Sequence, residues 1–306
     1  MAAAGRRVVS SRDAERLGVD ARALRRAAKD GRLVRVRRDA YVDGARWGRA
    51  TGPDRHLVQV SAAARALPDA VFSHESAAAV WGLPVLGGWP SSVRVVGAYR
   101  GGGRRLAGVV HRSSTLAVET ESRAGIRVTT CSRTVVDLAR ERPFATALAA
   151  ADHALRAGLV TEEELALLVA SLGPRRGVRG ARHVVAHACG LAESPGESLS
   201  RARMIEIGLV LPVLQTEMRD SKGLIGRVDF WWPTLGIVGE FDGRVKYRQD
   251  GVDDRRSPDD RLWDEKLRED RLRAAGSRVV RWTWDDAWDV DRFADVMRRA
   301  GVPLAS

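Results

Sequence analysis

The chain has 306 residues, more than the roughly 250 to 300 over which a single hydrophobic core keeps growing, so we expect two or three domains. Its composition, 44% hydrophobic and 29% charged, is typical of a soluble globular protein and excludes a disordered chain. Two cysteines are too few for an extracellular disulfide framework, and neither a secretion signal nor an apolar run long enough to span a membrane is visible. We therefore predict a cytoplasmic protein without membrane association.

The net charge of +12 is concentrated towards the N-terminus. Residues 1–50 carry 14 lysines and arginines against 6 acids, and residues 51–190 carry 17 against 11. Residues 191–306 carry 20 against 22. This asymmetry indicates a basic segment that faces nucleic acid, joined to a segment that uses its acids for something else.

Residues 11–43 have the pattern of a helix, a turn, a second helix and a hairpin. A Leu-Gly-Val break at 17–19 ends the first helix, Asp20 is a suitable N-cap for the second, and Gly31 ends the second at the C′ position. The following stretch LVRVRRDAYV alternates as a two-stranded wing would. We therefore predict a winged helix-turn-helix DNA-binding domain over residues 1–50.

The basic side chains of this domain are candidate DNA contacts. We expect the second helix to enter the major groove and the wing to reach the phosphates. The candidates on the helix are Arg22, Arg25, Arg26 and Lys29, and those on the wing are Arg35, Arg37 and Arg38. The alternative is a small basic subdomain whose arginines are solvated or paired with acids elsewhere in the chain.

Residues 51–190 alternate helical and strand-like stretches, which predicts an α/β middle domain and a linker. Ser132 is a suitable N-cap for the helix in SRTVVDLARERP, and the Gly- and Arg-rich stretch at 172–185 is typical of a linker. We find no catalytic constellation in this region. His74 and His111 each lack a second ligand at helical spacing, so we interpret both as structural or surface residues.

From residue 193 the order of elements is clearer. The pattern predicts a helix, strands at 213–219, 224–232 and 236–242, a helix at 259–275, a strand at 277–284 and a final helix from about 289. This order is an α-β-β-β-α-β core with a trailing helix. Together with the preceding segments it places the protein in the mixed α/β class.

Three acids lie within the predicted hairpin RVDFWWPTLGIVGEFDG, residues 227–243. If its loop is residues 233–236, Trp232 pairs with Ile237 and Asp229 faces Glu240, while Asp242 lies on the same face. Directly opposed carboxylates have Cβ atoms about 4.5 to 5.5 Å apart, so they repel each other or one takes up a proton. A divalent cation removes this conflict, and oxygen ligands of this kind favour Mg²⁺ or Mn²⁺.

Neighbouring cations offer an alternative to a metal. The same register places Arg227 opposite Asp242, and Arg244, Lys246 and Arg248 follow the strand. Acids in strands are often simply paired with such cations.

Two predicted helices carry further candidates. Glu197 follows Ser194 by three residues, so it would either complete a capping box or act as a catalytic acid. Lys266 and Asp270 lie along the apolar stripe of the later helix, so they would form a plain salt bridge or place an ammonium beside a metal-bound phosphate. The stripe itself consists of Trp263, Leu267 and Ala274.

The runs RVDFWW, IVGEFDG, EKLREDRLRAAG and RVVRWTW follow an acid-bearing helix. Over about residues 193–300 they resemble the Vsr-like (very-short-patch-repair-like) domain of unknown function within the PD-(D/E)XK endonuclease superfamily. The resemblance implies a metal-dependent phosphodiesterase fold, with Asp229 and Glu240 as metal ligands and Glu197 as an accessory acid. The chain departs from the signature at Asp242, where the superfamily has lysine. Lys266 or Lys246 would then supply the positive charge.

The N-terminal half contains LRRAAKDGRLVRVRRDAYV, FSHESAAAVWGLP and VTTCSRTVVDLA. These runs resemble the AbiEi-type antitoxin of type IV toxin-antitoxin systems. The resemblance implies a winged-helix head followed by an α/β domain, DNA binding, regulation of transcription and a toxin as partner protein.

Our first hypothesis is a DNA-binding protein whose residues 191–306 form a Mg²⁺-dependent endonuclease-like domain that hydrolyses phosphodiester bonds. Asp229 and Glu240 would hold an ion that lowers the pKa of a bound water, Lys266 would assist electrostatically, and Asp242 would be a third ligand or a base. The alternative is a transcriptional regulator or antitoxin whose nuclease-like domain is catalytically inactive and serves for binding or dimerisation.

Overall fold

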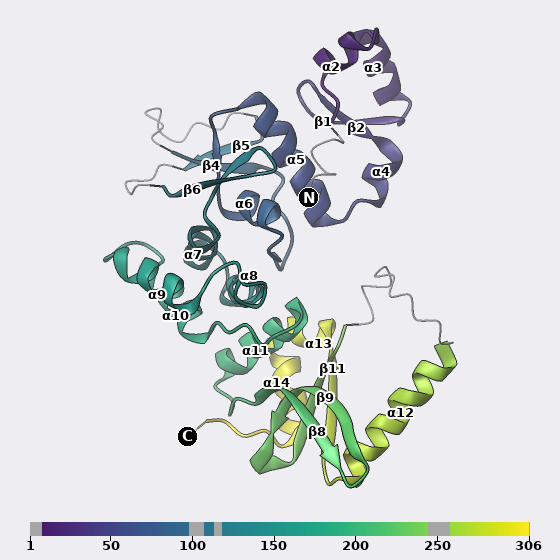
Figure 1. The fold of residues 1–306 in the computed structure, drawn as a ribbon, viewed down its shortest axis with the longest axis vertical. Coiled ribbons are helices and arrows are strands. Elements are labelled where there is room, and N and C mark those ends of the chain that lie inside the picture. The colour runs from purple at the N-terminus through teal and green to yellow at the C-terminus, as the bar shows by residue number, and fades with distance from the viewer. Residues whose placement is uncertain (1–7, 98–106, 113–117, 244–257, 306) are drawn as a thin grey trace. The chain divides into compact units, whose positions relative to one another are not determined.

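The computed structural model describes residues 8–97, 107–112, 118–243 and 258–305 (Figure 1). The chain divides into two compact units, Met1–Ala188 and Cys189–Ser306. Both units combine helices with β-sheet, so the predicted mixed α/β class is confirmed. Within the described residues, no helix is long and apolar enough to cross a membrane.

The first unit begins with two short helices and a hairpin. Helices α2 (Ser11–Arg16) and α3 (Ala21–Lys29) precede strands β1 (Leu33–Arg37) and β2 (Ala40–Asp43), and α4 (Gly44–Arg49) follows directly. The carboxylate of Asp20 caps α3 by accepting a hydrogen bond from the Ala23 N–H at 2.6 Å. Gly31 has a φ of +74°, as a residue just past the end of a helix often does. The local signals in the sequence therefore predict these elements correctly.

Helix α5 (Gly52–Ala66) packs against this hairpin. Val58 and Ala62 of α5 form a buried apolar cluster with Ala40 and Val42 of the hairpin and with Val8. Apolar packing therefore crosses the predicted domain boundary at residue 50. The division of the first unit into a head and a middle domain stays a prediction.

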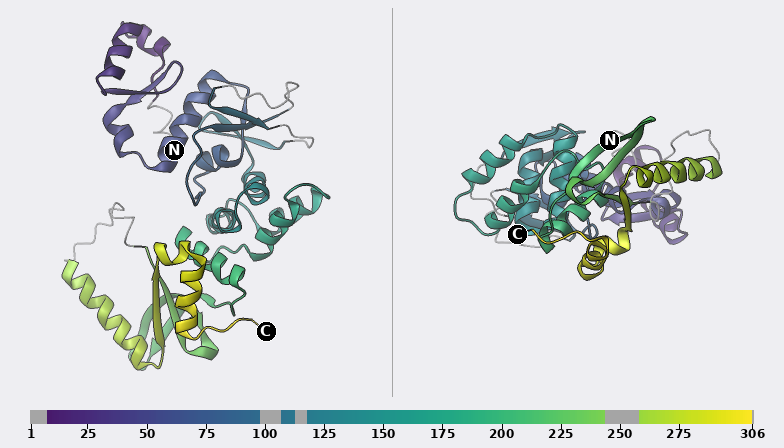
Figure 2. Two further views of the ribbon diagram at one scale, coloured as in Figure 1. Left: turned by 180° about the vertical axis from the view of Figure 1, so that it is seen from behind. Right: turned by 90° about the horizontal axis from the view of Figure 1, so that it is seen from below.

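A five-stranded sheet follows, with the order β5-β4-β3-β7-β6. Its strands are β3 (Val71–Phe72), β4 (Val93–Val96), β5 (Val109–Arg112), β6 (Thr120–Arg123) and β7 (Ile126–Thr129). The helices of this region are α6 (His74–Trp81), α7 (Cys131–Glu141), α8 (Phe144–Arg156), α9 (Glu162–Ser171) and α10 (Val178–His187). Figure 2 shows this region from two further sides.

Two local expectations for this region are wrong. Thr130, not Ser132, caps α7, because its side chain accepts the hydrogen bond from the Arg133 N–H. The stretch predicted as a linker contains α10, whose Val178, Ala181 and Val184 are buried in the core, so apolar spacing outweighs its Gly and Arg content.

The second unit contains a four-stranded sheet with the order β11-β10-β9-β8. Its elements in chain order are α11 (Pro195–Ile207), β8 (Val213–Asp220), β9 (Gly223–Trp232), the 3₁₀ turn η1 (Pro233–Leu235), β10 (Ile237–Asp242), α12 (Pro258–Ala274), β11 (Arg278–Thr283), α13 (Trp284–Trp288) and α14 (Val290–Ala300). Helix α12 lies on one side of the sheet, and α11, α13 and α14 lie on the other (Figures 1 and 2). This order of elements is the predicted one, while a nuclease core stays a prediction.

Aromatic packing holds the centre of this sheet. The rings of Phe230 and Trp282 have centroids 5.2 Å apart, and those of Trp282 and Phe293 are 5.6 Å apart. Gly239 allows β10 to approach Trp282, since a Cβ atom there would lie 2.6 Å from the Cη2 atom of the indole. A side chain at this position would therefore displace the aromatic core.

Candidate functional site

Helix α3 presents its cations to solvent. Leu24 is buried against Ala14 and Tyr41, which fixes the opposite side of the helix to the hairpin. The four candidate residues all lie on the exposed surface: Arg22, Arg25, Arg26 and Lys29. Within the described part of the chain, none of the four forms an ion pair with an acid. Among the described residues the cations of this helix are therefore solvated rather than paired, and their contact with DNA stays a prediction.

Only two of the three candidate arginines of the hairpin are exposed to solvent. Arg35 and Arg38 are exposed, whereas Arg37 is half-buried and burial lowers its pKa. The hairpin register shifts between Arg35 and Arg37, and this irregularity breaks the simple alternation expected for the strand. Arg37 lines a cavity of about 250 Å³ together with Gln59 and Val93.

The acid-bearing hairpin of the second unit has the predicted register. Trp232 pairs with Ile237, and the regular ladder continues to Phe230 and Gly239. The ladder ends there, because the Phe241 N–H donates to Asp229 Oδ2 at 2.9 Å. Asp229 is thus tied to the backbone of β10, and Asp242 is half-buried at the end of that strand.

Glu197 joins this group, although it forms only half of the predicted capping box. Ser194 Oγ accepts from the Glu197 N–H at 3.2 Å, as predicted. The Glu197 carboxylate, however, accepts from the Glu193 N–H at 2.8 Å and from Gln215 Nε2 at 2.9 Å. Glu197 is therefore turned towards the sheet of the second unit.

Gln215 links the two acids and is absent from the sequence-based candidates. Its Nε2 atom lies 3.5 Å from Asp229 Oδ1, so one amide faces both carboxylates. The residue sits within β8 with a φ of +51°, a conformation that is rare for a residue with a side chain. No local sequence signal marks this conformation, so only the fold reveals the residue.

Burial controls the charges of this site. Burial, together with the nearby charge of Glu197, raises the pKa of Asp229 to about 6. Burial also raises the pKa of Glu240, while the guanidinium groups of Arg268 and Arg281 oppose that rise. The site therefore disfavours bare negative charge unless a cation lies close by.

Two arginines provide the positive charge next to Glu240. Arg268 on α12 pairs with Glu240 Oε1, and Arg281 on β11 lies 3.3 Å from Glu240 Oε2. Both arginines also contact Glu265, and Arg281 lies 3.0 Å from Glu269 as well, so these charged groups form one network. Neither arginine was among the cations considered from the sequence, because each comes from an element far from the hairpin in the chain.

Of the cations predicted to neutralise the acids, only Arg227 lies within the described residues. Arg227 pairs with Glu193 at 2.7 Å rather than with Asp242. The other three, Arg244, Lys246 and Arg248, lie outside the described residues.

Lys266 does not lie on a buried side of its helix, as the sequence predicted. Lys266 and Asp270 are exposed, and so are Trp263 and Leu267 of the predicted apolar stripe. The Lys266 ammonium lies over the Trp263 ring, 5.5 Å from its centroid. Helix α12 instead packs on the sheet through the fully buried Leu272, because that turn meets apolar residues of β9 and β10.

The predicted Mg²⁺ or Mn²⁺ site stays a prediction, because the acids that would form it already have partners within the chain. Both oxygens of Glu240 face guanidinium groups, and the oxygens of Asp229 face the Phe241 N–H and the Gln215 amide. A metal ion would compete with these groups for the same carboxylate oxygens. Among the residues that the structure describes, no group of three or more His, Cys, Asp or Glu side chains could hold a metal.

Comparison with known proteins finds a family match at the N-terminus and relatives of part of the chain. Residues 1–42 match the family described as "Transcriptional regulator, AbiEi antitoxin". The uncharacterized proteins Rv2248 and MT2308, from Mycobacterium tuberculosis strains ATCC 25618 / H37Rv and CDC 1551 / Oshkosh, are each 39% identical over 109 residues. The match covers 36% of this chain and 40% of each relative, so the chain spans less than half the length of these relatives.

A solved structure, the RV2827C protein from Mycobacterium tuberculosis, has a TM-score of 0.38 and 14% identity. The match covers 70% of this chain and 83% of that one. A similarity this low supports no conclusion about fold or function.

Proposed function

We propose that this protein is a DNA-binding transcriptional regulator of the antitoxin type, with α3 as the helix that enters the major groove. The observation that carries the proposal is the set of four exposed cations on α3 that have no acid partner among the described residues. Unpaired cations on one helix attract phosphates, and the same helix can reach base edges in the groove. The family match over residues 1–42 supports this assignment, since it covers α2, α3 and nearly all of the hairpin.

The hairpin after α3 would serve as the wing. Arg35 and Arg38 are exposed there and would contact phosphates on either side of the groove. Because Asp39 of the hairpin turn accepts from the Ser11 N–H at 2.9 Å, the turn is anchored to the start of α2. The wing is therefore held to the helices before any DNA binds, which favours affinity because little ordering is required on binding.

The second unit would serve as a binding or dimerisation module rather than as a nuclease. The order of its helices and strands is the one expected for a nuclease-like domain. The negative charge of the Glu240 carboxylate, however, is already neutralised by Arg268 and Arg281. A toxin is the partner that the antitoxin family match suggests. We therefore propose that the whole protein binds a toxin as its partner protein.

A cleavage and binding assay tests this proposal. The purified protein would be incubated with labelled single- and double-stranded DNA in Mg²⁺, in Mn²⁺ or in EDTA, and each sample run on native and on denaturing gels. We expect a shifted duplex band of equal intensity in all three conditions and no shortened strand. Metal-dependent cutting that is lost in Glu240→Ala would instead support the endonuclease hypothesis, and absence of any shift would overturn the regulator.

A further inference from the structure

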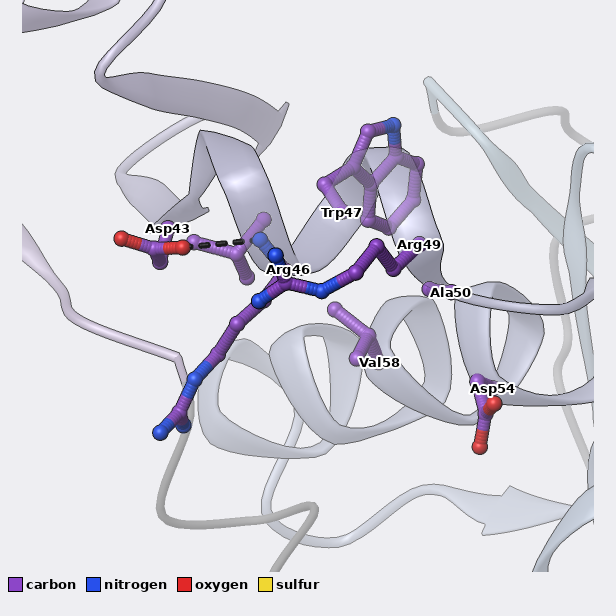
Figure 3. Close-up of a pocket in the computed structure, with 8 residues that line it drawn as sticks. Asp43, Arg46, Trp47, Arg49, Ala50, Asp54 and Val58 are labelled. Carbon is purple, nitrogen blue, oxygen red and sulfur yellow. Dashed lines mark hydrogen bonds between the residues drawn. The ribbon is translucent and has the colours of Figure 1, made fainter. Parts of the chain in front are cut away.

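A cavity of about 350 Å³ lies between α4 and the start of α5. Its wall combines the apolar side chains of Val42 and Val58 with the partly buried indole of Trp47. Arg46 and Arg49, both exposed, line the same cavity. Figure 3 shows these two arginines and Trp47 projecting from α4, with Val58 and Asp54 on α5.

The two acids of this cavity are committed to capping helices. Asp43 caps α4, with Oδ1 accepting from the Arg46 N–H at 2.8 Å. Asp54 belongs to the capping box of α5, and its Oδ2 accepts from the Thr51 hydroxyl at 2.7 Å. One oxygen of each carboxylate is therefore engaged at a helix N-terminus of the chain itself.

The guanidinium groups of Arg46 and Arg49, in contrast, have no acid partner in the part of the chain that the structure describes. The neighbouring Arg55 is used differently. It donates to the Trp47 carbonyl at 3.2 and 3.3 Å and lies over the Trp47 ring at 5.4 Å, so it closes the C-terminal end of α4. The cavity thus keeps two uncommitted guanidinium groups beside an apolar and aromatic wall.

Helix α4 is fixed against the end of the DNA-facing helix. The Gly44 N–H donates to the Arg32 carbonyl at 2.8 Å, just after α3 ends. A Cβ atom on Gly44 would lie 2.1 Å from the Gly31 carbonyl oxygen, so only glycine allows this approach. The exposed cations of α3 are therefore followed by the exposed Arg32 and then by the exposed arginines of α4.

We propose that this cavity binds a phosphate of the DNA that flanks the groove occupied by α3. Arg46 and Arg49 would pair with the phosphate, since the planar guanidinium fork matches phosphate oxygens, and Trp47 would lie against the adjoining sugar. This inference rests on the proposed function, because it takes the ligand to be the same DNA. A free nucleotide carries the same phosphate chemistry and is the other source to be distinguished.

The experiment measures the affinity of the full chain for a labelled 30-base-pair duplex by fluorescence anisotropy between about 0.05 and 0.3 M salt. We expect R46A/R49A to reduce the slope of log affinity against log salt by about 1.8, at about 0.9 per phosphate contact. At 0.1 M salt this corresponds to a loss of affinity of up to about 60-fold. R46K/R49K, which keeps both charges, should retain most of the slope.

The matched control is R179A/R182A, which removes two exposed arginines from α10. We expect its slope to equal that of the wild type. An R46A/R49A slope equal to that of the wild type would overturn the inference while leaving the proposed function intact. A wild-type chain that binds no DNA would overturn both.

A second arm separates the two sources of phosphate. Adenosine 5′-monophosphate would be titrated into the wild type and R46A/R49A by calorimetry. We expect no saturable binding to either protein. Saturable binding that the double variant loses, with an unchanged DNA slope, would assign the cavity to a free nucleotide and overturn our proposal.

Discussion

Arg268 of α12 pairs its guanidinium with the carboxylate of Glu240 of β10, at the place where the sequence predicts a metal ion. The two side chains come from elements separated by a long connection, yet both are largely buried. Arg281, on the neighbouring strand β11, also lies close to the Glu240 carboxylate. The positive charge that the buried Glu240 carboxylate requires is therefore supplied by the chain itself.

The first prediction concerns the ion pair between Arg268 and Glu240. Arg268→Ala leaves Glu240 with Arg281 alone, so we expect a loss of about 1 to 3 kcal/mol in the free energy of unfolding. Millimolar Mn²⁺ should restore part of this stability in the variant and have no effect on the wild type, as measured by thermal unfolding. The control is Arg219→Ala, which removes an exposed pair with Glu217. Stabilisation of the wild type by Mn²⁺ would show that Arg268 does not occupy the cation position.

The second prediction concerns pH. Because burial raises the pKa of Asp229 to about 6, the folded chain takes up a proton between about pH 4 and 6 that the unfolded chain does not hold. Its stability should therefore fall as the pH rises through this window. Asp229→Asn removes the buried charge, so it should raise the stability at pH 7.5 by about 1 to 3 kcal/mol and have little effect at pH 4. Equal stabilisation at both pH values would contradict a titrating Asp229.

The third prediction separates the wing arginines. Replacing the exposed Arg35 and Arg38 with alanine should reduce the salt slope of DNA binding by about 1.8, whereas Arg37→Ala should leave it within about 0.3 of the wild type. The physical reason is that Arg37 is half-buried in the cavity beside Gln59, so it does not reach solvent as the other two do. A slope change for Arg37→Ala equal to that for either neighbour would place this arginine on DNA after all.

Local chemistry in the sequence predicts much of this fold. Asp20 and Gly31 mark the two ends of α3, and the Pro-Thr-Leu-Gly break fixes the register of β9 and β10. These features depend on residues close together in the chain, so they are visible without the structure. The basic surface of α3 follows in the same way, because solvent exposure of cations is the default.

The acid site could be predicted only in part. The sequence identifies Glu197, Asp229 and Glu240 but neither Gln215 nor Arg268, which complete the contacts of these acids. Gln215 depends on a left-handed backbone conformation inside β8, and Arg268 depends on which side of α12 meets the sheet. The apolar stripe suggested a different side, but the packing of Leu272 and the ion pairs of Arg268 determine the orientation instead.

The most direct test of the central proposal compares two charge-matched variants of the full chain in DNA binding. R22A/R25A/R26A removes three exposed cations from α3, and R156A/R179A/R182A removes three exposed cations from α8 and α10. By fluorescence anisotropy at 0.1 M salt, the α3 variant should lose at least 100-fold in affinity for a duplex selected from a random library, about 0.9 log units per lost phosphate contact. The control variant should bind within about threefold of the wild type. Equal losses in the two variants would show that DNA binding is only a response to net charge, and would contradict α3 as the DNA-binding helix.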